Sequence, residues 1–192
     1  MKIGVLALQG DFAEHLTMLG RLGAQAVEVR LPPQLDDLDG LIIPGGESTT
    51  IGKMAVAYDL MEPLQAFGHQ HAIWGTCAGA IFLSKDIHRN QPLLKLMDIT
   101  IERNAFGRQV NSFEVDLTVP ELLQVDPNDR PYHAIFIRAP LIESVQDHVQ
   151  VLAKLDDGRI VAARQGRWLA TSFHPELTTD DRFHRYFLSL AQ

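Results

Sequence analysis

The chain has 192 residues, of which 46% are hydrophobic and 21% are charged, as in a single ordinary globular domain. With 17 Lys and Arg against 24 Asp and Glu, its formal net charge is -7, so it lacks the overall positive charge that binding to nucleic acid or an anionic membrane requires. The single cysteine excludes an internal disulfide and a multi-cysteine zinc cluster. The N-terminal apolar run is too short for a signal peptide, and no run approaches the roughly 20 residues of a membrane span. These features predict a cytoplasmic protein that contacts neither nucleic acid nor membrane.

The first half of the chain alternates short apolar strands with helices. Residues 3–8 form a nearly continuous apolar run, which indicates a strand buried on both faces, and Asp11 is the expected N-cap of the next helix. Further strands are expected at 26–29, 40–43 and 72–74, and further helices from Ser48 and over 80–83. This alternation predicts a parallel sheet covered by helices.

The second half has a different pattern, in which strands dominate. They are expected at 99–103, 112–119, 133–137, 149–155, 160–164 and 168–173, followed by a closing helix over 179–190. Asp157-Gly158 and Gln165-Gly166 are turn dipeptides that join some of these strands in hairpins. No repeat or linker interrupts the sequence, so residues 1–192 are predicted to form one mixed α/β domain.

The only cysteine lies in the segment Gly75-Thr76-Cys77-Ala78-Gly79, between a predicted strand and a predicted helix. A nucleophile at such a turn is exposed on a sharp elbow, and the helix N-terminus favours negative charge on its sulfur. The backbone N–H of Ala78 is then available to an oxyanion. The alternative is that Cys77 is a small buried core side chain. A cysteine that only packs in the core does not require glycine on both sides.

A cysteine nucleophile needs a proton-transfer partner, and His174 is the strongest candidate among the eight histidines. It follows the predicted strand 168–173, and Glu176 is two residues further, where an extended chain places both side chains on one side. Such a carboxylate can orient an imidazole. Taken singly, His174 could bond a carbonyl and Glu176 could be a solvated turn residue. Both Cys77 and His174, however, lie at the carboxyl ends of predicted strands, where open α/β sheets bind ligands.

A second glycine loop, Gly45-Gly46-Glu47-Ser48, ends the strand at 40–43. Its backbone can approach a substrate oxygen and complete an oxyanion hole; the alternative is an ordinary tight turn. It does not match a phosphate-binding loop.

Two arginines, Arg103 and Arg138, end apolar strands where a guanidinium can clamp a carboxylate; surface ion pairs are the alternative. The remaining histidines have no ligands at metal-binding spacing, so no metal is predicted.

These motifs together resemble a known family, the glutaminase subunits of pyridoxal 5'-phosphate synthase (the PdxT/SNO family), which are small class I glutamine amidotransferases. The resemblance spans nearly the whole chain. The stretches that carry it are Leu8-Gln9-Gly10-Asp11, Pro44 to Thr50, Gly75 to Gly79, Glu102-Arg103-Asn104, Phe106-Gly107-Arg108-Gln109, Phe136 to Pro140 and Ser172 to Glu176.

The resemblance implies a flavodoxin-like domain, with a mostly parallel central sheet flanked by helices and extra β-hairpin elements in the C-terminal half. It implies that Cys77 attacks the carboxamide of L-glutamine, that His174 protonates the departing ammonia, and that Glu176 orients His174. An oxyanion hole would come from Gly46 and Ala78. The residues that would hold glutamine are Gly46, Glu47, Ser48, Arg103, Ile137 and Arg138.

No cofactor is implied for the chain itself. The ammonia would pass to a (β/α)8-barrel synthase subunit of the PdxS/SNZ family, with which the chain would form a large ring assembly. The nearest rival is the glutaminase of another amidotransferase, such as the one serving imidazole glycerol phosphate synthesis. A rival of a different class is a non-enzymatic redox sensor that uses Cys77, in which His174 and Glu176 would have no purpose.

Overall fold

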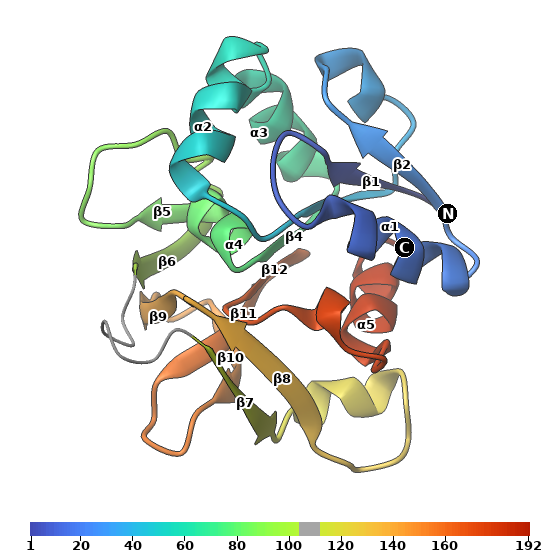
Figure 1. Cartoon of the computed structure of the whole chain (residues 1–192), viewed down its shortest axis with the longest axis vertical. Coiled ribbons are helices and arrows are strands. Elements are labelled where there is room, and N and C mark those ends of the chain that lie inside the picture. Colours follow the sequence, from blue (N-terminus) through green and yellow to red (C-terminus); the bar gives the residue numbers. More distant parts are fainter. Residues whose placement is uncertain (104–111) are drawn as a thin grey trace.

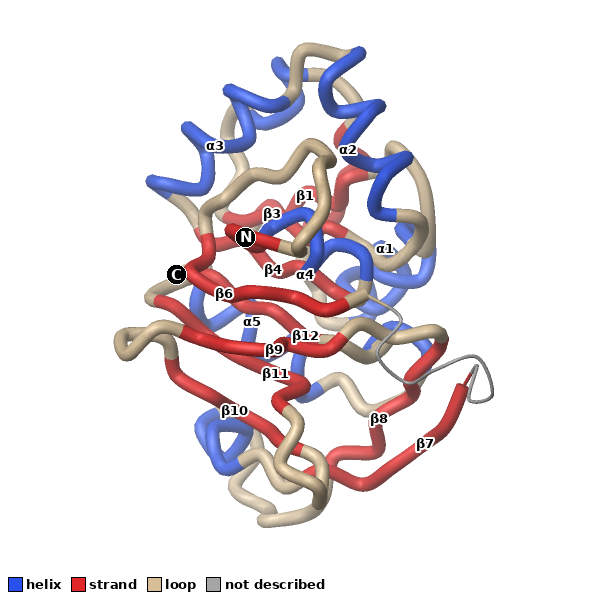
Figure 2. The backbone as a smooth tube through the Cα atoms, turned by 90° about the vertical axis from the view of Figure 1, so that its left-hand side faces the viewer, coloured by secondary structure: helices blue, strands red, loops and turns tan. Residues whose placement is uncertain are grey.

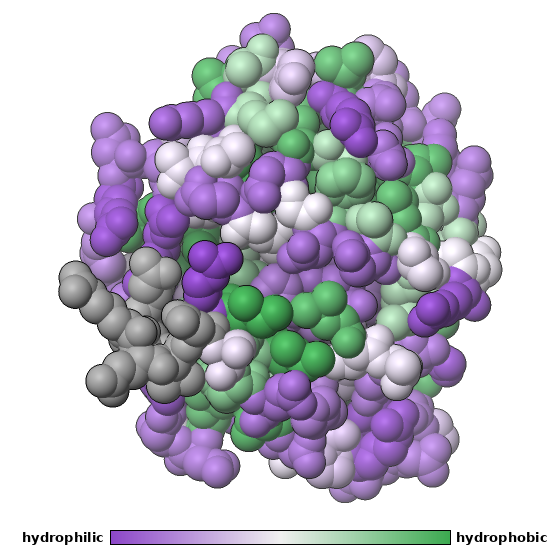
Figure 3. Space-filling view, in the orientation of Figure 1, coloured by the Kyte–Doolittle hydropathy of each residue, from purple (hydrophilic) through white to green (hydrophobic). Residues whose placement is uncertain are grey.

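The computed structural model describes residues 1–103 and 112–192 of the chain. Asn104 and the stretch Phe106 to Gln109, which contribute to the family resemblance, lie outside the described residues. Among those described, no helix combines the length and the apolar character needed to cross a membrane. Hydrophilic side chains cover much of the face in Figure 3, and hydrophobic ones are visible near its centre and over its upper part.

The first half alternates strands and helices as the sequence predicts. Its elements are β1 (Lys2–Leu6), α1 (Phe12–Arg21), β2 (Gln25–Val29), the 3-10 turn η1 (Pro32–Leu35), β3 (Gly40–Ile43), α2 (Ser48–Ala57), α3 (Met61–Gln70), β4 (Ala72–Thr76) and α4 (Ala78–Leu83).

The second half consists mainly of strands. Its elements are β5 (Ser84–Asp86), β6 (Met97–Glu102), β7 (Ser112–Leu117), the 3-10 turn η2 (Pro120–Gln124), β8 (Tyr132–Ile137), β9 (Leu141–Val145), β10 (Gln150–Lys154), β11 (Ile160–Gln165), β12 (Trp168–Thr171), the 3-10 turn η3 (Pro175–Leu177) and α5 (Arg182–Leu190).

The large sheet joins both halves of the chain. Its order is β2-β1-β3-β4-β12-β11-β9-β6-β5, with β10 paired to β11. The strands from β2 to β12 are parallel, whereas β12, β11, β9 and β6 pair antiparallel. Figure 2 shows β6, β9, β11 and β10 side by side, and the β7–β8 ribbon forms a separate small sheet. The predicted mixed α/β fold, parallel in its first half and hairpin-rich in its second, is confirmed.

Helices cover both faces of the parallel strands. Along β1, Val5 packs into a core with Leu19 of α1 and Phe187 of α5. Its neighbour Leu6 points the other way, into a core that includes Leu64 of α3. Figure 1 shows α2 and α3 at the top of the molecule, with α5 and the β7–β8 ribbon below. Because successive strand residues point to opposite faces and both faces are buried, the strand has an apolar residue at nearly every position.

Some elements were not predicted from the sequence. Helix α3 contains Pro63, which an α-helix tolerates in its first turn, and β5 and β9 are short strands held by pairing with β6. Asp11 occupies the predicted N-cap position of α1, but its side chain makes no capping hydrogen bond. Its carboxylate is directed instead toward His174, as described below.

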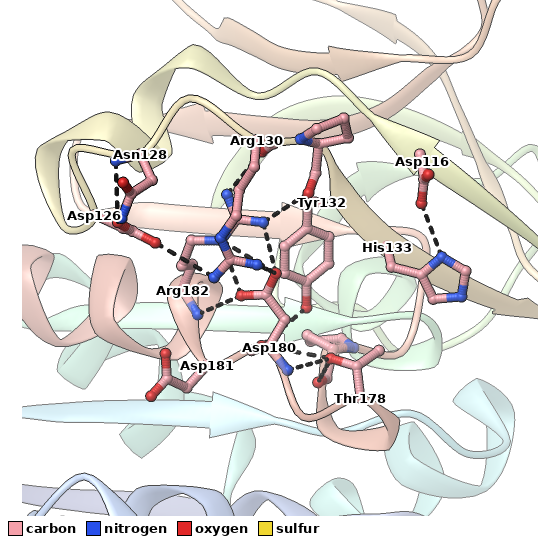
Figure 4. A network of polar contacts seen from close by, with 12 residues as sticks. Asp116, Asp126, Asn128, Arg130, Tyr132, His133, Thr178, Asp180, Asp181 and Arg182 are labelled. Atoms are coloured by element: carbon pink, nitrogen blue, oxygen red, sulfur yellow. Dashed lines mark hydrogen bonds and ion pairs between the residues drawn. The ribbon is translucent and has the colours of Figure 1, made fainter.

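A buried arginine links α5 to the loop before β8. Arg182 is 2% exposed; its guanidinium donates to the backbone carbonyls of Arg130 and Pro131, both at 2.8 Å, and to the carboxylate of Asp180 at 2.6 Å. Figure 4 shows this network gathered between the two segments. Since Asp180 follows η3 closely in the chain, the network also anchors the segment that carries His174 and Glu176.

Replacing Arg182 with Met should lower the free energy of unfolding by about 3 kcal/mol, because it leaves two buried carbonyls and the Asp180 carboxylate without their donor. The control is Arg185→Met on the same helix, where the arginine side chain is 49% exposed and pairs with Asp181. Its loss should cost under about 1 kcal/mol. Urea unfolding of both variants measures the difference, and equal effects would contradict the role given to the network.

Candidate active site

Cys77 lies between β4 and α4 in a strained backbone conformation. Its φ is 47° and its ψ is -107°, a region that non-glycine residues rarely occupy. Its N–H donates to the carbonyl of Thr171 at the end of β12, at 2.8 Å, which holds the turn against the neighbouring strand. The side chain is 7% exposed. The predicted elbow is therefore present, and the strain lies in the cysteine itself.

The glycines of the elbow provide space. A Cβ on Gly75 would lie 2.5 Å from the carbonyl carbon of Gly79, and one on Gly79 would lie 1.9 Å from the carbonyl oxygen of Ile43. Neither glycine has a φ in the left-handed region. Their role is thus to let the ends of β3 and β4 and the start of α4 meet backbone to backbone.

His174 and Glu176 form a buried pair beside this turn. Nδ1 of His174 lies 2.7 Å from Oε1 of Glu176, and the residues are 4% and 6% exposed. The backbone N–H of His174 donates to the carbonyl of Ile135 in β8 at 2.8 Å. Burial disfavours the imidazolium, but interactions with Cys77 and Glu176 outweigh it and raise the pKa of His174 to about 10. Cys77, His174 and Glu176 are thus brought together as the sequence predicts.

The loop after β3 supports the histidine. A Cβ on Gly45 would lie 2.5 Å from Cε1 of His174, so a larger residue there would displace the ring. The carbonyl of Gly45 accepts from the N–H of Asp11 at 3.1 Å. The Asp11 carboxylate lies 3.6 Å from Nδ1 of His174, on the same nitrogen that Glu176 engages.

These groups open onto a pocket of about 430 Å³, within the size range of small-molecule sites. Every residue predicted to hold glutamine, to form the oxyanion hole or to act as nucleophile or base contributes to its wall, and Glu176 lies behind it. The wall consists of Gln9, Gly10, Asp11, Gly46, Glu47, Ser48, Cys77, Ala78, Ile81, Arg103, Ile137, Arg138, Pro140, His174 and Leu177.

Glu47 and Arg103 are held by each other and by α2. Glu47 is the N-cap of α2 and accepts from the N–H groups of Thr49 and Thr50, at 3.2 and 2.7 Å. Slight burial opposes ionisation, but these bonds and the Thr50 hydroxyl lower the pKa of Glu47 to about 2. The guanidinium of Arg103 lies 3.0 Å from Glu47 Oε1 and 3.0 Å from Gln91 Oε1. Glu47 thus has a structural role, because its carboxylate caps α2 and holds the guanidinium of Arg103 in the pocket wall.

Two pocket features were not singled out as site residues from the sequence. Gln9 Oε1 accepts from the backbone N–H of Glu47 at 2.6 Å and orders the loop after β3. Asp11 approaches His174, as noted above. The only signal for either was the stretch Leu8 to Asp11, which carries the family resemblance but no recognisable chemistry.

One cluster of metal-ligand type occurs among the described residues. Ligand atoms of Asp11, His174 and Glu176 lie within 4.8 Å of one another. Both carboxylates face Nδ1 of His174, which already bonds Glu176 at 2.7 Å.

Comparison with solved structures defines the class of protein. A crystal structure of a glutamine amidotransferase has a TM-score of 0.91 and 51% identity, with 98% of each chain covered. The same fold, at 20% and 17% identity, occurs in a putative GMP synthase subunit from Thermoplasma acidophilum and in PurLQS from Thermotoga maritima, with TM-scores of 0.69 and 0.72. The fold is that of a glutamine amidotransferase.

Sequence comparison gives the family. The model of the SNO glutamine amidotransferase family matches residues 5–191. A pyridoxal 5'-phosphate synthase subunit PdxT from Herpetosiphon aurantiacus is 60% identical over 99% of this chain and all of its own length, and one from Dehalococcoides mccartyi is 57% identical over all of this chain and 98% of its own. The chain therefore belongs to the SNO glutamine amidotransferase family.

Substituting Ala at Gly79 should destabilise the chain by roughly 2 kcal/mol or more, since the new methyl group overlaps the Ile43 carbonyl. Gly20→Ala in α1 is the control, because a Cβ there meets nothing within 4 Å. That control should raise stability by up to about 1 kcal/mol through helix propensity. Thermal unfolding of both variants tests the close approach, and a Gly79 variant as stable as the wild type would contradict it.

His174 should remain protonated well above the usual range of histidine, because its pKa is raised to about 10. Titration of its ring nitrogens by NMR should show the charged form through neutral pH. In Cys77→Ala the transition should move to lower pH, because one of the groups that stabilise the imidazolium is gone. A transition near pH 6.5 in the wild type would contradict the prediction.

Proposed function

We propose that this chain hydrolyses L-glutamine to L-glutamate and ammonia, and that the ammonia serves pyridoxal 5'-phosphate biosynthesis. The observation that carries the proposal is the convergence of Cys77, His174 and Glu176 at one pocket, in a chain more than half identical to PdxT subunits over nearly its full length. A redox sensor would not need a buried carboxylate bonded to a histidine beside its cysteine.

In the proposed reaction Cys77 Sγ, whose proton is held by His174, attacks the carboxamide carbon of glutamine, and the oxygen gains negative charge near the N–H groups of Ala78 and Gly46. The carbon–nitrogen bond breaks as His174 delivers a proton to the nitrogen, which releases ammonia and leaves a glutamyl thioester. His174 then removes a proton from water, whose oxygen attacks the thioester carbon. The carbon–sulfur bond breaks, which releases glutamate and regenerates Cys77 as the nucleophile. Glu176 keeps the imidazole oriented throughout.

Glutamine binding is assigned to the rest of the pocket wall. Arg103, fixed by Glu47, supplies a charge for the substrate carboxylate. The hydroxyl of Ser48 is buried and has no hydrogen-bond partner within the described part of the chain, which suits a group that bonds a ligand. Ile137, the last residue of β8, and Arg138, which follows it, also line the pocket, and Arg138 holds a strained φ of 45°.

We infer that the chain works with a partner subunit. The names of its relatives indicate a synthase subunit, and the proposed partner is a (β/α)8-barrel synthase that receives the ammonia within a large ring assembly of both subunits. The proposed location is the cytoplasm, where a lone thiol stays reduced.

Glutamate release should be measured with the purified chain, alone and with the barrel synthase, and pyridoxal 5'-phosphate followed after addition of pentose and triose phosphates. We expect both products from the mixture, and at least a thousandfold loss of glutamate release in Cys77→Ala, which has no nucleophile. Arg30→Ala is a control outside the pocket and should retain wild-type rates, because Arg30 pairs with Glu28 on the exposed surface.

Full activity of Cys77→Ala would refute the assignment of the nucleophile. Glutamate release without pyridoxal 5'-phosphate would preserve the glutaminase and refute the proposed ammonia acceptor.

A further inference from the structure

Behind the His174–Glu176 pair lies a second, fully buried pair of histidines that the reaction above does not use. His15 projects from α1 and His184 from α5, and both are 0% exposed. Nδ1 of His15 lies 3.0 Å from Nε2 of His184. The other nitrogen of His15, Nε2, lies 3.3 Å from Glu176 Oε2 and 3.3 Å from Thr76 Oγ1. His15 therefore contacts the far side of the carboxylate that orients His174.

The far oxygen of Glu176 needs a donor. Oε1 is engaged by His174, whereas Oε2 is buried and makes no hydrogen bond of good geometry within the described part of the chain. A buried carboxylate oxygen without a donor is costly. The His15 ring is the donor-bearing group that faces it.

The hydrogen-bond pattern decides which nitrogen of His15 carries the hydrogen. Burial lowers the pKa of His15, as do the neighbouring His184 and His174, and burial lowers the pKa of His184 to about 3. Both rings are therefore neutral, with one N–H each. Only one hydrogen can lie between His15 Nδ1 and His184 Nε2.

If His15 donated that hydrogen, its bare Nε2 could accept from the Thr76 hydroxyl but would leave Glu176 Oε2 without a donor, and His184 would carry its own hydrogen on Nδ1. That Nδ1 is buried and has no partner among the described residues. If His184 donates instead, His15 carries its hydrogen on Nε2, toward Glu176, and the unpartnered nitrogen of His184 is only an unused acceptor. The second arrangement leaves fewer buried groups unsatisfied.

A fixed carboxylate matters here because two acids compete for His174. Asp11 Oδ2 lies 3.6 Å from the same Nδ1 that Glu176 Oε1 reaches at 2.7 Å. Rotation of the Glu176 carboxylate would lengthen its bond and change the direction in which the imidazole points.

We propose that His15 is a positioning residue: with His184 donating to its Nδ1, it donates its Nε2–H to Glu176 Oε2 and holds that carboxylate against His174. The proposal rests on the proposed glutaminase function for its kinetic consequence, although the hydrogen-bond arrangement can be tested without activity.

The direct test is NMR of the full chain labelled with 15N histidine. We expect His15 as the neutral Nε2–H form and His184 also as the Nε2–H form at neutral pH. A His15 ring protonated on Nδ1 alone would overturn the proposal. Because this measurement needs no substrate, it still decides the matter if the chain proves not to hydrolyse glutamine, an outcome that refutes the proposed function instead.

The kinetic test compares two amides at position 15 in the complex with the barrel synthase. The nitrogen of Gln matches Nε2 of histidine, whereas that of Asn matches Nδ1. His15→Asn should lower kcat for glutamate release roughly ten- to a hundredfold with little change in KM, the range seen when the outer partner of an oriented ligand is removed. His15→Gln should restore kcat to within about threefold of wild type, because it keeps the donor.

Leu19→Ala, one turn further along α1, controls for loss of packing alone. Leu19 is 0% exposed and belongs to the core between α1 and the sheet. Compared at equal folded fractions, this variant should keep the wild-type kcat. Equal losses in the Asn and Gln variants, or a loss of the same size in Leu19→Ala, would overturn the proposal.

Discussion

The close approach of backbones at the carboxyl edge of the sheet is the constraint on which the site depends. The end of β3, the end of β4 and the start of α4 meet where Gly75 and Gly79 leave no room for a Cβ. This contact bends the chain at Cys77 and brings the loop after β3 beside it. Gly45 in that loop then lies against the ring of His174. Nucleophile, base and substrate loop are thus placed by one set of contacts between small residues.

Several buried polar groups lie around this edge, and their hydrogen-bond partners come from elements that are far apart in the chain. His174 bonds Glu176, and behind that carboxylate lie His15 of α1 and His184 of α5. Buried charges are expensive unless hydrogen-bonded, so each helix that supplies a partner is also fixed in position by it. Packing of α1 and α5 on the sheet and orientation of the catalytic base are therefore coupled.

The pattern of apolar residues predicted β1, β3 and β4 because these strands are buried on both faces. The hairpin strands were recognisable from their turn dipeptides. Helix α3 was missed because Pro63 interrupts its sequence pattern, although its place in the first turn is harmless. Strands β5 and β9 were missed because they owe their conformation to pairing with β6 rather than to their own composition. Glu47 was predicted as a substrate contact, and its additional role as the N-cap that holds Arg103 depends on a residue 56 positions away.

The sequence by itself determined the alternation of strands and helices, the glycine frame around Cys77, and the proximity of His174 to Glu176, because each of these is encoded within a few neighbouring residues. Only the tertiary structure decided that Asp11 faces His174, that His15 of α1 faces Glu176, and that His184 of α5 contacts His15. The physical reason is that a local sequence pattern indicates burial and turns. The hydrogen-bond partner of a buried polar atom depends instead on how elements far apart in the chain pack together.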